Sequence, residues 1–416
     1  MLEFKLHFKN AYQNTSFFSL HEDTQKFLEE KAYKYKFSHS QIRNLITITI
    51  DLQMWNKDIK KEWKDDENKK IAIKHIQQIY ENYKNTPKQY FPTNKEKREK
   101  KYKVIEVEKN SFGFGSCPVA SSKTRCCNLL TLDVYEGCAF ECSYCSIQSF
   151  YDETMIKIDK DFKAKLLNLK LEKDKIYHIG TGQSSDSLLF GDSFEALSAL
   201  LEFAKKNQNV ILELKSKSNN INALLKSEIP KNVICTFSLN PDVVVQNEEL
   251  FSASLHGRIT AAKTLKDKGV LVGFHFHPMI VFQGFENEYK KIANELMSTF
   301  HHDEVAMISF GTLTFIKPVL KNIRANLKSS KILQMPLIEA AGKYSYPLNA
   351  KKEMFKMLYD EFKLWHKKVF FYLCMEDESL WNEVFGYEYK NNEEFENAMK
   401  NSYMQKIKYA QTNMKD

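Results

Sequence analysis

Three closely spaced cysteines constrain this chain of 416 residues more than any other feature of its sequence. Cys138, Cys142 and Cys145 follow the pattern C-x3-C-x2-C, and Tyr144 stands directly before the third cysteine. The preceding stretch 129–134 is typical of a buried strand that ends in a loop. Three thiolates in a compact loop can bind three irons of a [4Fe–4S] cluster, which normally takes four cysteine ligands. The spacing therefore predicts a cluster with one iron left open for another ligand.

Zinc is the main alternative for these cysteines. Zinc sites favour four nitrogen or sulfur ligands, often arranged as paired C-x2-C units. Here only Cys142 and Cys145 form such a pair, and no H-x3-5-H arrangement lies near them. A third interpretation is that the cysteines are free thiols that pack as small hydrophobic side chains.

Three further cysteines, Cys117, Cys126 and Cys127, stand shortly before this loop. In a reducing compartment, clustered cysteines are more often metal ligands or reactive groups than disulfide partners. These three are candidate hydrogen-atom donors. They could also shield the cluster, bind a second metal or pack as small hydrophobic side chains.

Charge and hydropathy restrict the location and the partners that we expect. The 61 Lys and Arg residues exceed the 53 Asp and Glu residues, which gives a formal net charge of +8. This charge is compatible with DNA or another nucleic acid as partner, but it is weak evidence because a lysine-rich solvated surface is the commoner explanation. The N-terminus lacks a signal-peptide pattern, and no run approaches the roughly 18 apolar residues that span a bilayer. We expect a cytoplasmic protein without a membrane segment.

Apolar periodicity predicts an α/β fold in three parts. Residues 1–103 form a mainly helical N-terminal extension, in which the Ile/Thr-rich stretch 43–55 also fits a strand but is long enough to favour a helix. Residues 104–310 form the core, and residues 311–416 form a smaller C-terminal α+β region. Strands alternate with helices in the core, which favours a partial parallel (β/α)6 barrel. Its six strands are expected at 129–134, 175–180, 209–214, 233–238, 270–277 and 304–310.

Polar residues follow several of these strands, at the end of a barrel where active sites lie. Ser185 follows the second strand, Lys217 the third, and Ser238 and Asn240 the fourth. Hydroxyl and amide groups can hold a cofactor, and a lysine can pair with a carboxylate. Each of these residues could instead cap a loop or face solvent.

The stretch 129–310, a little under half of the chain, resembles spore photoproduct lyase within the radical S-adenosylmethionine (SAM) superfamily. The cysteine motif with Tyr144 is highly specific for the superfamily. Ser185-Asp186, Lys217, the run 237–242, Arg258 and the run 270–289 are moderately specific for the lyase branch.

The resemblance implies that Cys138, Cys142 and Cys145 bind a [4Fe–4S] cluster and that Tyr144 lies near the adenine of SAM. It also implies that Ser185, Lys217, Ser238 and Asn240 contact SAM. In this family the reduced cluster cleaves SAM to a 5′-deoxyadenosyl radical, which abstracts a hydrogen atom. A reducing partner such as flavodoxin or ferredoxin is then expected, and the family's substrate is a methylene-bridged thymine dimer in DNA.

Three departures from the family set this chain apart. The lyase has a hydrogen-donating cysteine where this chain has Gln183, and a tyrosine where it has Ser146. The basic, aromatic C-terminal hairpin that the lyase uses on DNA has no clear counterpart at 311–350. We therefore expect a lyase-like radical SAM enzyme with a different reaction, on a nucleic acid or else on a peptide, tRNA or small metabolite. A non-catalytic iron–sulfur protein that senses redox state or binds nucleic acid is the alternative from another class.

Overall fold

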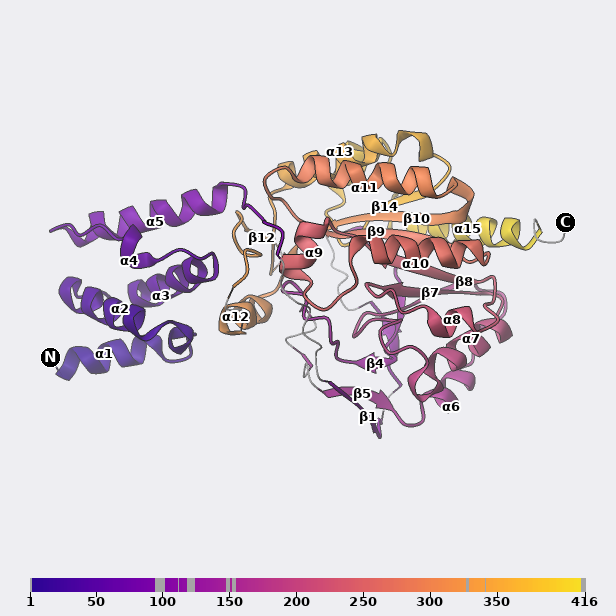
Figure 1. Cartoon of the computed structure of the whole chain (residues 1–416), viewed down its shortest axis with the longest axis horizontal. Helices are drawn as coiled ribbons and strands as arrows, with labels where there is room; N and C mark the ends of the chain where they lie inside the picture. The colour runs from indigo at the N-terminus through magenta and orange to yellow at the C-terminus, as the bar shows by residue number, and fades with distance from the viewer. Residues whose placement is uncertain are drawn as a thin grey trace.

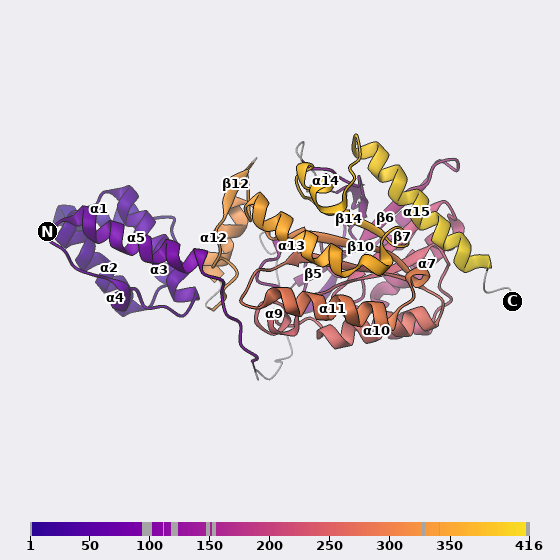
Figure 2. The same ribbon diagram turned by 90° about the horizontal axis from the view of Figure 1, so that it is seen from above.

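The structure is a computed structural model, and it is elongated, with the two chain ends at opposite ends of the molecule (Figures 1 and 2). It describes residues 2–93, 102–110, 112–117, 124–146, 150–151, 155–326, 329–340 and 342–412. A group of helices at one end joins a larger body built on a curled sheet, and α12 (Lys317–Asn326) lies between the two (Figure 1).

The N-terminal extension is helical, as the periodicity predicts. The ambiguous stretch 43–55 lies mostly in the helix α3, His39–Met54, and most of its Ile and Leu side chains are buried. Ser38 and Gln41 form a capping box at the start of α3, which satisfies two of its free backbone N–H groups. The extension's helices are α1 (Leu2–Tyr12), α2 (Glu22–Tyr35), α3, α4 (Ile59–Glu62) and α5 (Lys69–Asn85).

The core is an eight-stranded, curled half-barrel sheet in the described part of the chain. Its order is β14-β10-β9-β8-β7-β6-β3-β2, and all neighbouring pairs are parallel except β2 with β3. The six predicted strands all form and lie side by side. They are β3 (Leu130–Leu132), β6 (Tyr177–Thr181), β7 (Val210–Ser216), β8 (Val233–Ser238), β9 (Leu271–Met279) and β10 (Val305–Thr312). The two outermost strands are β2 (Phe114–Ser116) and β14 (Phe370–Leu373).

The two faces of the sheet differ in polarity. Along β9, Phe274 and Phe276 contact aromatic side chains of α11 (Phe285–Thr299) and of the residue that follows it. The intervening His275 lies on the opposite, concave face, because side chains alternate along a strand. On that face His178 packs against Tyr403 of α15 (Asn392–Thr412), with ring centroids 5.3 Å apart. The concave face therefore gathers polar side chains, whereas the outer face is the apolar core.

Helices and two small sheets complete the body. The outer helices are α6 (Phe162–Leu167), α7 (Ala196–Lys206), α8 (Asn222–Leu225), α9 (Asp242–Glu248), α10 (Leu255–Asp267), α11, α13 (Leu348–Glu361) and α14 (Ser379–Phe385). One small sheet contains β1 (Lys103–Val107), β5 (Met155–Asp159) and β4 (Tyr135–Glu136). The other contains β11 (Thr314–Phe315), β13 (Lys343–Ser345) and β12 (Ile338–Ala340).

The stretch after residue 310 contributes to several parts of the molecule. β14 extends the main sheet, α15 crosses β7, β9 and β10, and α12 lies next to the helical extension (Figures 1 and 2). Antiparallel pairing of β12 with β13 makes a hairpin in the region where none matching the lyase's was expected, with Lys343 and Tyr344 among its residues. The domain boundaries at 103/104 and 310/311 stay a prediction.

No helix among the described residues has the length and apolarity needed to cross a bilayer. Cytoplasmic location stays a prediction.

Candidate active site

The cysteine loop is fastened by backbone hydrogen bonds on both sides. Gly137 opens the loop with a φ of 98°, and its N–H donates to the carbonyl of Ser184 at 3.1 Å. On the other side, Cys142 pairs with Glu249 in an antiparallel bridge, and the N–H of Ser143 donates to the carbonyl of Glu248 at 2.8 Å. The loop is thus held between the end of β6 and the segment after α9, at the edge where parallel strands end.

The three loop cysteines are thiols outside any disulfide; Cys142 is buried, and Cys138 and Cys145 are half-buried. Burial raises the pKa of Cys138, and burial likewise raises that of Cys142, while the positive charge of Lys217 opposes both shifts. Their thiolates would therefore form with metal binding, which releases the protons.

Sulfur spacing argues against a single zinc ion at this loop. With Zn–S bonds of about 2.3 Å, tetrahedral ligands lie less than about 4 Å apart. Among the described residues, only His301, His302 and Asp303 place three such ligand atoms within 4.8 Å of one another. The thiols of Cys138, Cys142 and Cys145 are spread more widely, which suits a larger group with several irons.

Lys217 is placed beside the loop by a buried aspartate, Asp186. One oxygen of Asp186 accepts from the N–H of Lys217 at 2.6 Å, and the other accepts from the hydroxyl of Ser216 at 2.8 Å. The ammonium group of Lys217 then lies 5.7 Å from the ring centroid of Tyr144. The predicted carboxylate-binding lysine and the predicted adenine neighbour are therefore adjacent.

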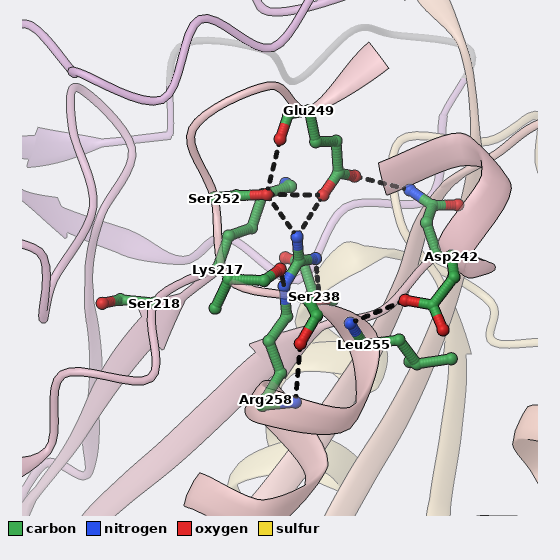
Figure 3. A network of polar contacts seen from close by, with 12 residues as sticks. Lys217, Ser218, Ser238, Asp242, Glu249, Ser252, Leu255 and Arg258 are labelled. Carbon is green, nitrogen blue, oxygen red and sulfur yellow. Dashed lines mark hydrogen bonds and ion pairs between the residues drawn. The ribbon is translucent and has the colours of Figure 1, made fainter. Parts of the chain in front are cut away.

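A buried network of hydrogen bonds around Glu249 stabilises this arrangement (Figure 3). Glu249 accepts from Tyr144, from Arg258, and from the amide of Asn240 at 2.9 Å. Arg258 also donates to the carbonyl of Ser238 at 2.7 Å. Burial alone would raise the pKa of Glu249, but the charge of Arg258, followed by other favourable contacts, holds it at about 2. Glu249 is thus a carboxylate that fixes Tyr144 and the end of β8 together.

The residues predicted to contact SAM differ in how many of their polar atoms already form hydrogen bonds within the protein. The hydroxyl of Ser185 is buried and has no hydrogen-bond partner among the described residues. Asn240 is fully buried and already uses part of its amide, since it donates to Glu249 and accepts from Tyr289 at 2.7 Å. One amide hydrogen and one oxygen lone pair of Asn240 are left. An unsatisfied buried hydroxyl next to Ser184, whose carbonyl binds the start of the cysteine loop, fits a site for SAM at a cluster.

The three candidate hydrogen donors meet in one cavity of about 70 Å³ at the same end of the barrel. Cys117, Cys126 and Cys127 line it together with Gln183 and a fourth cysteine, Cys374, which follows β14. A hydrogen bond from Cys127 lowers the pKa of Cys126 to about 6, while that bond and burial raise the pKa of Cys127. The structure therefore brings these thiols beside the position where the family has its cysteine.

The side chains of His178, Glu213 and His275 also line this cavity. Glu213 contacts Nε2 of both His178 and His275 at 2.8 Å, and Nδ1 of His275 lies 2.6 Å from the hydroxyl of Ser309. Burial lowers the pKa of His275 to about 4, so its ring is neutral at pH 7. A neutral ring that donates through Nε2 to Glu213 must accept at Nδ1 from Ser309.

Sequence reasoning missed Glu248, Glu249 and Cys374. The two glutamates follow Gln246 and Asn247 at the polar end of α9, which is a weak signal because acidic residues are common in such positions. Cys374 directly follows β14, and nothing in the local pattern of that segment indicates that it joins the main sheet.

Comparison with known proteins shows which family and which fold this chain is similar to. A family model described as spore photoproduct lyase matches residues 92–361, which is more than half of the chain. Spore photoproduct lyase of Clostridium acetobutylicum is 22% identical over 222 residues, covering 52% of this chain and 64% of that protein. The Bacillus subtilis protein is 23% identical over 203 residues, covering 47% of this chain and 59% of its own length. The chain thus spans less than two thirds of either relative.

Solved structures share the fold. Spore photoproduct lyase complexed with dinucleoside spore photoproduct gives a TM-score of 0.55 at 19% identity, covering 65% of this chain and 82% of that one. A mutant with bound AdoMet and the same dinucleoside gives 0.54 at 20% identity with the same coverage. This likeness shows a common half-barrel fold.

Proposed function

Because this chain belongs to the spore photoproduct lyase family, we propose that it is a radical SAM enzyme that acts on DNA or another nucleic acid. The observation that carries the proposal is the loop of three cysteine thiols near Lys217 and Ser185, at the edge where the parallel strands end. In parallel barrels this edge is where the chemistry takes place.

Each predicted residue has a proposed role in holding the cofactors. Cys138, Cys142 and Cys145 bind a [4Fe–4S] cluster, and Lys217 pairs with the carboxylate of SAM. Ser185 hydrogen-bonds to SAM, and Tyr144 lies against its adenine. When bound, the cluster supplies the electron that cleaves SAM to a 5′-deoxyadenosyl radical.

Ser238 and Asn240 complete the SAM site at the end of β8. The carbonyl of Ser238 is held by Arg258, and the amide of Asn240 is held by Glu249 and Tyr289. These bonds fix both residues in one orientation, so that cofactor binding costs less conformational entropy.

The substrate is proposed to enter the cavity lined by Gln183 and the thiols. Gln183 has no hydrogen that a carbon radical could abstract easily, so we assign hydrogen donation to Cys117, Cys126 or Cys127. A net charge of +8 suits a polyanionic substrate, and flavodoxin or ferredoxin would supply the electron.

The test is SAM cleavage by the anaerobically reconstituted protein with dithionite, measured as 5′-deoxyadenosine by chromatography. We expect product from the wild-type chain and none above background from C142A, since three cysteines are needed to hold the cluster. Equal amounts from both proteins, or none from an iron-loaded wild type, would contradict the proposal.

A second substrate class is favoured by one observation: the family match begins at residue 92, so it excludes the helical extension. An extension outside the family match suits a substrate other than the family's DNA lesion, such as a peptide, a tRNA or a small metabolite. Parallel incubations with UV-damaged DNA, undamaged DNA and bulk tRNA decide this point. Repair of the damaged DNA would favour the family's reaction, whereas modification of tRNA alone would favour the second class.

A further inference from the structure

Glu248, the neighbour of Glu249, holds the cysteine loop through its backbone carbonyl, but its buried side chain has no part in the site described so far. It is 1% exposed. Its Oε2 atom accepts from the hydroxyl of Ser143 at 2.5 Å and from the hydroxyl of Ser330 at 2.7 Å. Ser143 lies between Cys142 and Cys145, so this carboxylate contacts the cluster loop directly.

The other oxygen of Glu248 holds two segments that are remote in sequence. Oε1 accepts from the hydroxyl of Tyr90 at 2.7 Å and from the N–H of Lys331 at 3.1 Å. Tyr90 belongs to the stretch that leads from α5 to the core, and Lys331 follows α12. One side chain therefore ties the cluster loop to the linker of the helical extension and to the segment after α12.

Four donors surround this one side chain: three are hydroxyls, and the fourth is the N–H of Lys331, which can only donate. A carboxylate only accepts hydrogen bonds, and each of its oxygens can accept two. Glutamine at this position would turn its NH₂ group towards two of the four donors. The nearby Lys88 is also buried, and its pKa is lowered to about 8 by burial, which the charge of Glu248 partly offsets. The surrounding donors and the nearby buried lysine both favour a negatively charged side chain at position 248.

We propose that Glu248 is a positioning residue of the cluster loop, which it holds through Ser143 and joins to the linker of the helical extension through Tyr90. The inference rests on the proposed function, because the loop is taken as the cluster site. Contacts to the residues that carry metal ligands commonly change metal affinity or activity by about 10- to 100-fold when they are lost.

The first test uses metal-free protein and measures how fast Cys142 is alkylated by iodoacetamide, located by mass spectrometry. S143A removes only the hydroxyl that contacts Glu248, and E248Q removes the charge. Loss of one charge-assisted buried bond makes local opening about tenfold more frequent, so we expect Cys142 to react about tenfold faster in both variants. The matched control is S227A, whose hydroxyl donates to the carbonyl of Ala223 at 2.8 Å, in the connection between α8 and β8. It should react as the wild type does.

The second test uses reconstituted protein and measures retained iron and the electron paramagnetic resonance signal of the reduced cluster. S143A should lose iron to a chelator about tenfold faster than S227A and shift the signal. Y90F keeps the bond between Ser143 and Glu248 but removes the bond from Tyr90 of the linker. It should change the rate of iron loss and the resonance signal in the same direction as S143A.

Natively folded S143A and E248Q proteins that match the wild type in both tests would overturn the inference. An unchanged Y90F beside an altered S143A would overturn the link to the extension. Absence of a cluster in the wild type would instead contradict the proposed function, and the alkylation test would still decide the role of Glu248.

Discussion

Glu249 and Arg258 form a fully buried ion pair, and removing one partner leaves the other charge uncompensated. We expect E249Q to lower the free energy of unfolding by about 3 to 5 kcal/mol, because a buried guanidinium without its carboxylate is strongly unfavourable. Urea denaturation followed by circular dichroism measures this. The control is E108Q, which removes the exposed partner of Lys160 and should cost at most about 1 kcal/mol. Equal losses in both variants would contradict the prediction.

Acid should erase the difference between E249Q and the wild type. The pKa of Glu249 is about 2 in the folded chain and 4.5 ordinarily. Because its pKa is lower in the folded state, ionised Glu249 contributes its full stabilisation above about pH 4.5. The contribution is lost as the pH falls towards 2, because the unfolded state binds the proton first. The difference in unfolding free energy between the two proteins should therefore shrink below pH 4.5. A constant difference between pH 7 and pH 3 would show that Glu249 does not carry this linkage.

Among the elements, α3 depends on its N-terminal cap. Ser38 accepts from the N–H of Gln41, and the side chain of Gln41 accepts from the N–H of Ser38 at 3.0 Å. We expect S38A to cost about 1 kcal/mol of stability in thermal or urea unfolding. T47A, at a half-buried position in the middle of α3, removes a hydroxyl that donates to the carbonyl of Arg43 at 3.0 Å; it should be neutral or slightly stabilising because alanine has the higher helix propensity. A larger loss in T47A than in S38A would refute the capping argument.

Elements with a strong local pattern could be predicted from the sequence. β8 forms at 233–238 as expected, because a short apolar run with β-branched residues is typical of a strand buried on both faces. The polar strand ends Ser185, Lys217 and Ser238 could likewise be predicted, since parallel strands end at one edge. The polar contacts that hold the cysteine loop could not be predicted, because Glu248 contacts Ser143 and Glu249 contacts Tyr144, each across 105 positions of sequence. Local periodicity contains no information on such distant polar contacts.

At the scale of the whole molecule, the helical extension is attached to α12 by a second buried carboxylate. Asp51 of α3 is 0% exposed and accepts two hydrogen bonds from Arg324, at 2.7 and 2.9 Å. Tyr80 of α5 donates to the same carboxylate at 2.7 Å. Arg324 is therefore the charged contact in this attachment, beside the bond from the N–H of Ser330 to the carbonyl of Met54 at 3.2 Å.

We expect R324A to destabilise the chain by about 3 kcal/mol or more, because Asp51 would lose its counter-charge in a buried position. The extension should then separate more often from α12, and trypsin should cut faster within 86–93, as peptide mapping would show. K352A removes one partner of an exposed ion pair with Glu383 and serves as the control. Equal cleavage rates in the two variants would mean that Arg324 does not hold the extension.

The position of β14 has a consequence for how the chain is made. β10 pairs on its outer side only with β14, which is supplied by residues 370–373, whereas the other parallel strands of the core come from the chain before residue 313. At synthesis rates of about 5 to 20 residues per second, the outer edge of β10 stays open for roughly 3 to 12 seconds after it has left the ribosome. An open edge of an apolar strand recruits other strands. Nascent chains that stall between β10 and β14 should therefore be the species most prone to aggregate.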